Sequence, residues 1–133
     1  MSSQSPGLAV VVADDDPDIR QLVVLAVTRA GGAVTAEVGS GAAALQAIRQ
    51  TAPELAILDV SMPELTGLEV CRALRADPAT AAVRIMLLSA AVHPAAVQEG
   101  LAAGADVYAH KPFSPRKLAA QIRDMLPHLE ESG

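Results

Sequence analysis

Aromatic residues are almost missing from this sequence of 133 residues, which has one Tyr, one Phe and no Trp. Hydrophobic residues nevertheless make up 51% and charged residues only 19%. The core must therefore be aliphatic, and the composition is that of a globular domain rather than a disordered chain. The length fits one domain of ordinary size.

Cysteine and basic residues are also scarce. Cys71 is the single cysteine, so no internal disulfide can form and a reducing compartment, the cytoplasm, is expected. Ten Lys and Arg residues against fifteen Asp and Glu give a net charge of -5, without a basic cluster interleaved with aromatics. Direct binding of nucleic acid is therefore not expected.

Long apolar runs are absent too. The apolar stretches are of strand length, far below the roughly 20 residues that cross a bilayer. Residues 1–7 lack the basic and apolar regions of a signal peptide. Neither membrane insertion nor export is expected.

The sequence does contain five short apolar runs that alternate with helical patterns, at 8–13, 33–38, 55–58, 85–88 and 107–109. This alternation is typical of βα units, and predicts a three-layer α/β fold with a parallel sheet covered on both faces. Thr35 and Glu37 interrupt the second run, which suits an edge strand. The aliphatic runs from Leu8, Leu55 and Ile85 suit the buried centre.

Apolar residues at helical spacing predict the intervening helices. The clearest stripes are Ile19, Leu22, Val23, Ala26 and Val27, and Leu118, Ile122, Met125 and Leu126; weaker ones are Leu45 with Ile48, and Val70 and Cys71 with Leu74, and the weakest covers 94–103. Asp16 and Ser114 each precede a proline, as an N-cap does. Gly31, Gly32 and Gly104 are expected to end helices.

Polar residues follow four of the five predicted strands: Asp14 and Asp15, Asp59, Ser89, and Lys111. In a parallel sheet these strand ends share one edge, where open α/β folds bind ligands. Three converging carboxylates would repel one another strongly without a cation. Oxygen ligands favour Mg²⁺, with Mn²⁺ as a possible substitute.

Each feature also has a simpler explanation. Asp16 is expected only to cap a helix, and an Asp-Asp pair before a helix often complements the helix dipole. Asp59 could belong to a turn, Lys111 to an exposed loop, and Tyr108 could be a half-buried aromatic. Their occurrence together on one predicted edge favours a functional site.

Four segments resemble the response regulator receiver, or CheY-like, domain of two-component signalling. They are VADDDPDIR at 12–20, LDVSMP at 58–63 with Gly67, LSA at 88–90 and YAHKPF at 108–113. The resemblance covers 8–126 and implies a doubly wound, flavodoxin-like (βα)5 fold with strand order 2-1-3-4-5. It predicts a receiver domain at 8–127, with tails at 1–7 and 128–133.

Under this resemblance, Asp59 accepts a phosphoryl group from the phosphohistidine of a sensor kinase or phosphotransfer protein. Asp59, Asp15 and the Ser61 carbonyl would bind Mg²⁺ directly, and Asp14 mainly through water. Lys111 would pair with Asp59 and then with the phosphoryl group. The bond before Pro112 would be cis. The domain would be a signalling switch rather than an enzyme acting on other substrates.

The resemblance also makes Ser89 and Tyr108 switch residues, whose movement repacks the face formed by the fourth helix, fifth strand and fifth helix. A downstream effector, a missing output domain or a phosphorylation-dependent dimer would use that face, where Arg116, Lys117 and Arg123 are expected. Glu64 stands where many relatives have Gly. Ser61 and Ala91 occupy positions that tune the phosphoryl lifetime.

Three other functions fit the sequence less well. Haloacid-dehalogenase-like phosphatases use an Asp-x-Asp-x-Thr/Val motif, but Pro17 and Asp18 follow Asp16 here, and the chain is short and lacks a cap domain. A flavin-binding module would need phosphate-binding amides where three aspartates stand. A docking module that is never phosphorylated would not need the acidic residues with Lys111.

Overall fold

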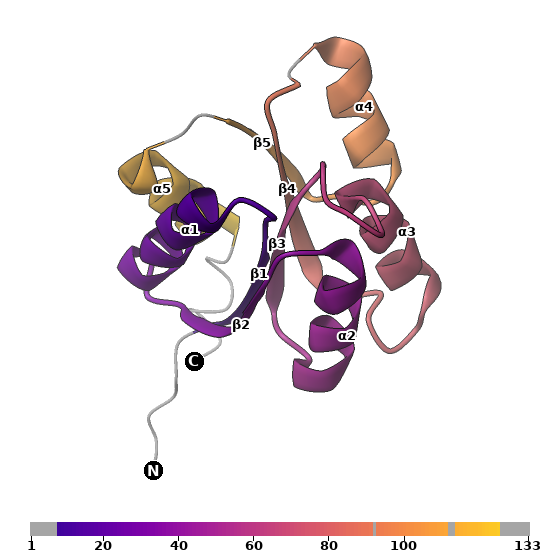
Figure 1. Cartoon of the computed structure of the whole chain (residues 1–133), viewed down its shortest axis with the longest axis horizontal. Helices are drawn as coiled ribbons and strands as arrows, with labels where there is room; N and C mark the ends of the chain where they lie inside the picture. Colours follow the sequence, from indigo (N-terminus) through magenta and orange to yellow (C-terminus); the bar gives the residue numbers. More distant parts are fainter. Residues whose placement is uncertain (1–7, 92, 112–113, 126–133) are drawn as a thin grey trace.

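Five βα units in sequence form the molecule (Figure 1). The computed structural model describes residues 8–91, 93–111 and 114–125. The elements are β1 (Ala9–Ala13), α1 (Pro17–Arg29), β2 (Ala33–Val38), α2 (Gly41–Thr51), β3 (Leu55–Asp59), α3 (Gly67–Ala76), β4 (Arg84–Ser89), α4 (Pro94–Ala102), β5 (Val107–His110) and α5 (Pro115–Met125). Each strand agrees with its predicted run to within one residue at either end.

The five strands pair in parallel in the order β2-β1-β3-β4-β5, which confirms the predicted α/β fold and strand order. β3 is buried along its whole length, and β1 and β4 are buried except at their first residues. No residue of β2 is fully buried, so the strand carrying Thr35 and Glu37 lies at the edge as predicted. The aliphatic runs therefore occupy the centre.

Helices cover both faces of the sheet, with α1 and α5 on one side and α2, α3 and α4 on the other (Figure 1). Side chains alternate along β1, so that Val10 and Val12 pack toward α1 and α5, whereas Val11 and Ala13 pack on the opposite face. The two aliphatic cores fix the sheet rigidly between the helical layers. All ligand-binding loops at the carboxyl ends of the strands are built on this frame.

The predicted helix boundaries are present. Asp16 caps α1 by accepting hydrogen bonds from the N–H groups of Asp18 and Ile19, and Ser114 accepts one from Lys117. Gly31 and Gly104 follow α1 and α4 with φ of 92° and 114°, a region that glycine occupies without steric cost.

One residue of the predicted apolar stripe on α1 does not pack against the core. Leu22 is 37% exposed, whereas Val23, Ala26 and Val27 are buried. The apolar stripe on α1 is wider than the surface on which the helix packs.

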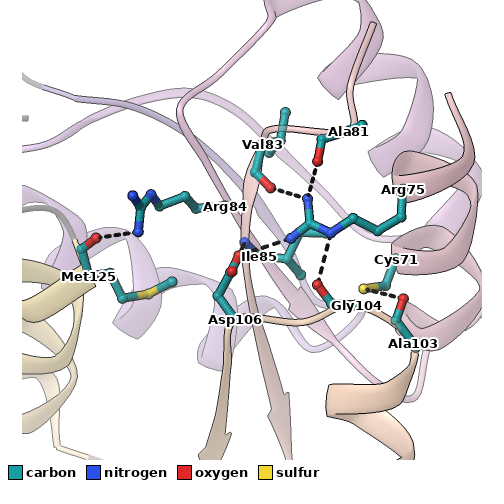
Figure 2. A network of polar contacts seen from close by, with 10 residues as sticks. All are labelled: Cys71, Arg75, Ala81, Val83, Arg84, Ile85, Ala103, Gly104, Asp106 and Met125. Carbon is teal, nitrogen blue, oxygen red and sulfur yellow. Dashed lines mark hydrogen bonds and ion pairs between the residues drawn. The ribbon is translucent and has the colours of Figure 1, made fainter. Parts of the chain in front are cut away.

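A polar network ties three elements together at the amino end of the sheet (Figure 2). The Arg75 guanidinium, at the end of α3, donates to the carbonyls of Gly104 and Ala81, both at 2.9 Å, and to that of Val83. It also pairs with Asp106 at 2.9 Å. The same Asp106 oxygen accepts the Ile85 N–H at 2.8 Å, so α3, the start of β4 and the loop before β5 are joined.

Two further contacts reinforce this end (Figure 2). The buried Cys71 thiol donates to the Ala103 carbonyl at 3.3 Å, and burial raises the pKa of that thiol. Arg84 donates to the Met125 carbonyl at 3.0 Å and thereby connects β4 to α5.

None of the helices within 8–91, 93–111 and 114–125 is both long and apolar enough to span a bilayer. The predicted tails, the Pro112 peptide bond and Leu126 lie outside the described residues.

Candidate functional site

Acidic side chains from the ends of β1 and β3 meet Lys111, which follows β5, at the carboxyl edge of the sheet. The Lys111 ammonium lies 2.9 Å from Asp14 Oδ2 and 3.1 Å from Asp59 Oδ1. Carboxylate oxygens of Asp14, Asp15 and Asp59 all lie within 4.8 Å of one another. The structure therefore brings together the four charged residues that the sequence placed at one edge.

Backbone contacts hold these side chains in place. Asp14 donates its N–H to the Val38 carbonyl, and its Oδ1 accepts the N–H of Asp16 at 2.9 Å. Lys111 donates its N–H to the Ser89 carbonyl at 2.8 Å.

Glycine is required at residue 67, because a Cβ there would overlap the Asp59 carbonyl. The start of α3 can thus press directly against the end of β3. The backbone of α3 therefore packs against the backbone of Asp59 and limits its movement.

The site carries an excess of negative charge, and two of its three carboxylates are buried. Asp14 and Asp59 are 0% and 4% exposed, whereas Asp15 is exposed. Burial, followed by the charge of Asp14, raises the pKa of Asp59, although Lys111 and the Ser61 N–H oppose this rise. Burial alone would lower the pKa of Lys111, but its hydrogen bonds and charge interactions with Asp14 and Asp59 outweigh burial and raise it.

A divalent cation fits this donor set. Asp14 Oδ2 is buried and has no hydrogen-bond partner, although it is ion-paired with Lys111. All three clustered side chains offer oxygen, which Mg²⁺ prefers, and Mg²⁺ usually takes one or two carboxylates and keeps several waters. Asp14, Asp15 and Asp59 are the residues that would hold it.

The two predicted switch residues both bond to the backbone of Ala91. Ser89 Oγ accepts the Ala91 N–H at 3.0 Å, and the Tyr108 hydroxyl donates to the Ala91 carbonyl at 2.6 Å. The Tyr108 ring packs over Gly100 of α4, where an added Cβ would lie 2.6 Å from Cδ2. A cavity of about 300 Å³ adjoins Ser89, Ala91 and Tyr108, and leaves space beside them for movement.

Two contacts of the site were not foreseen. Arg20 donates to the Asp14 carbonyl at 2.9 Å, although the sequence indicated it only as part of the resembling segment 12–20. Ala91 connects Ser89 to Tyr108 through backbone groups, which no side-chain pattern reveals. Glu64, which stands where many relatives have Gly, has φ of 72°, the left-handed conformation that glycine adopts most readily.

Comparisons with known proteins point to one family and one fold. The model of the response regulator receiver domain matches residues 10–123. The DNA-binding response regulator MtrA of Mycolicibacterium smegmatis is 40% identical over 122 residues, which cover 92% of this chain and 52% of that protein. The chain spans about half the length of such curated relatives.

Solved structures share the fold. The signal receiver domain of the putative response regulator NarL from Mycobacterium tuberculosis has a TM-score of 0.84 and 32% identity, covering 92% of this chain and 98% of that one. The chemotaxis response regulator CheY4 of Vibrio cholerae also has a TM-score of 0.84 and 32% identity, covering 90% and 99%. Sequence and structure thus identify one family.

Proposed function

Because the chain belongs to the response regulator receiver domain family of two-component signalling, we propose that Asp59 is its phosphoacceptor. The observation that carries the proposal is the position of Lys111, whose ammonium contacts both Asp14 and Asp59. The Lys111 ammonium thus contacts both Asp59, the carboxylate that would react, and Asp14, a carboxylate that would bind metal. The domain would span residues 8–127 and act in the cytoplasm.

The phosphoryl donor would be a phosphohistidine of a sensor kinase or phosphotransfer protein. An Asp59 carboxylate oxygen attacks phosphorus in line, the P–O bond forms, and the P–N bond breaks with the electron pair returning to the imidazole. Lys111 stabilises charge on the phosphoryl oxygens. Asp14, Asp15, Asp59 and the Ser61 carbonyl would hold Mg²⁺ or Mn²⁺, which neutralises the anionic groups during transfer.

Phosphorylation would be read through Ser89 and Tyr108. In the described state the Ser89 hydroxyl is engaged by the Ala91 N–H, and Tyr108 holds the carbonyl of the same residue. A phosphoryl oxygen that accepts a hydrogen bond from the Ser89 hydroxyl would draw Oγ away from the Ala91 N–H, and the Tyr108 contact with Ala91 would shift in turn. Tyr108 and α4 would then repack, which alters the α4–β5–α5 face toward an effector, an output domain or a second receiver.

The half-length match to DNA-binding regulators leaves room for an output domain outside this chain. The domain itself would not bind nucleic acid, since it is acidic overall. It would catalyse only its own phosphorylation and dephosphorylation. A phosphatase with an Asp-x-Asp motif would require Asp16 as an acid, whereas Asp16 caps α1.

The test is incubation with Mg²⁺ and a small-molecule phosphodonor, followed by intact mass measurement. We expect one phosphoryl adduct in the native protein, no adduct in Asp59→Asn, and none when a chelator is added. Asp16→Asn preserves the helix cap and should be phosphorylated normally. No adduct on the native protein would overturn the proposal, and sustained turnover of an aryl phosphate would favour a phosphatase instead.

A further inference from the structure

Arg20 extends from the first turns of α1 to the backbone beside the acidic pocket. Its Nη1 donates to the Asp14 carbonyl at 2.9 Å, and its Nε pairs with Glu37 on β2 at 3.3 Å. We infer that Arg20 is a positioning residue, which orients Asp14 and Asp15 for the divalent cation. This inference rests on the proposed function.

The bonded carbonyl is the reason that Arg20 can position both aspartates. It belongs to the peptide that joins Asp14 to Asp15, and a planar peptide carries the Cα of each residue in fixed directions. The other polar groups of Asp14 are already used, its N–H by Val38, its Oδ1 by Asp16 and its Oδ2 by Lys111. The Arg20 bond therefore fixes the remaining backbone group.

The guanidinium is itself held in position. Glu37 lies at the end of β2 and restrains Nε, while Gly39 lies on the other side, where a Cβ would be 3.4 Å from Nη1. The Arg20 side chain is only 23% exposed. This anchoring accounts for a glutamate near the end of the edge strand, and it requires the fork of arginine, since lysine presents one ammonium instead of two separated donors.

Charge and geometry make opposite predictions for this residue. Removing a positive charge near three carboxylates should tighten cation binding if Arg20 acts only through charge. Removing a group that orients metal ligands typically weakens metal affinity about 10- to 100-fold. The direction of the change thus separates the two roles.

The experiment titrates the full chain with Mn²⁺ and measures free Mn²⁺ by electron paramagnetic resonance, with thermal unfolding followed by circular dichroism on the same samples. We expect the Mn²⁺ Kd to rise about tenfold in Arg20→Gln and to rise clearly in Arg20→Lys, which keeps the charge. Arg29→Gln removes the same charge from the other end of α1 and should leave Kd within about twofold.

Two outcomes overturn the inference while leaving the proposed function intact. One is an unchanged or lower Kd in Arg20→Gln, and the other is a wild-type Kd in Arg20→Lys. If Arg20→Gln fails to fold, Arg20→Lys alone decides, because its charge is native. A wild-type protein that binds no Mn²⁺ at millimolar concentration would overturn both the inference and the metal-dependent function.

Discussion

The two ends of the sheet treat charged side chains in opposite ways. At the amino end, Arg75 has three carbonyl acceptors and the Asp106 carboxylate, which in turn accepts a backbone N–H (Figure 2). At the carboxyl end, Lys111 is shared by two buried carboxylates, whose oxygens lie within 4.8 Å of an oxygen of Asp15. One end is electrostatically balanced, and the other is not.

This difference indicates how stability and function are divided. A network in which every polar group has a partner stabilises the fold without a bound ion. A site with excess negative charge lowers the stability of the fold until a cation or a proton binds. Such unfavourable local electrostatics are typical of functional sites. The contrast can be tested by changing charges at each end.

The largest effect is expected for Lys111→Met in buffer with chelator. The variant leaves buried Asp14 and Asp59 without their cation, and removal of one member of a buried ion pair typically costs about 3–5 kcal/mol. Urea unfolding should show this loss, and millimolar Mg²⁺ should restore much of it. A loss that Mg²⁺ leaves unchanged would contradict a metal site in this pocket.

Arg75→Ala should destabilise the protein by about 2–3 kcal/mol, because charge-assisted hydrogen bonds to several acceptors are lost. In contrast with Lys111→Met, Mg²⁺ should recover nothing, since the network lies at the other end of the sheet. Arg72→Ala, an exposed change on the same helix, should stay within about 0.5 kcal/mol. If urea unfolding shows the same loss of unfolding free energy for Arg75→Ala and Arg72→Ala, the stabilising role of the Arg75 network is contradicted.

Asp59→Asn should instead stabilise the metal-free protein at pH 7–8, by about 0.5–2 kcal/mol. Burial and Asp14 raise the pKa of Asp59 above its ordinary value of 3.8, so ionising Asp59 costs native-state stability. That cost appears as pH rises from 3.8 through the native pKa. Urea unfolding at several pH values should therefore show that the difference in unfolding free energy between Asp59→Asn and the native protein becomes smaller as the pH falls.

Mg²⁺ should also narrow the gap between Asp59→Asn and the native protein, by stabilising the native carboxylate. A variant less stable than the native protein at neutral pH would show that Asp59 is not under electrostatic stress. Asp16→Asn, which keeps the cap, serves as the matched control because Asp16 is exposed.

The smallest effects are expected where both ends resemble each other. Glu64, between β3 and α3, and Ala52, after α2, have φ of 72° and 47°. Glycine relieves the strain of a left-handed backbone, although it also raises the entropy of the unfolded chain. We therefore expect Glu64→Gly and Ala52→Gly each to raise the free energy of unfolding by a net amount of about 0.5–1 kcal/mol, measured by thermal unfolding. Destabilisation at residue 64 alone would indicate that Glu64 makes a compensating interaction.

Much of the fold could be predicted because its signals are local. Uninterrupted aliphatic runs mark buried parallel strands, and the residues after them must share an edge, which placed Asp14, Asp59 and Lys111 correctly. The exposure of Leu22 was missed because helical spacing gives the direction of a side chain, not the width of the surface beneath it.

Contacts from side chains to distant backbone groups could not be predicted. Arg75 and Asp106 are 31 residues apart, and three of the Arg75 acceptors are carbonyls, whose positions do not depend on residue type. Arg20 and Ala91 act through backbone groups in the same way. The reactive side chains were therefore visible in the sequence, whereas the groups that orient them were not.

The Tyr108 contact has a spectroscopic consequence. The chain has one tyrosine and no tryptophan, so absorbance and emission from the phenol come from a single ring. That ring packs on Gly100, and its hydroxyl donates to Ala91. The protein thus contains a natural optical probe at the contact that links β5 to the loop before α4, and its signal can be assigned without labelling.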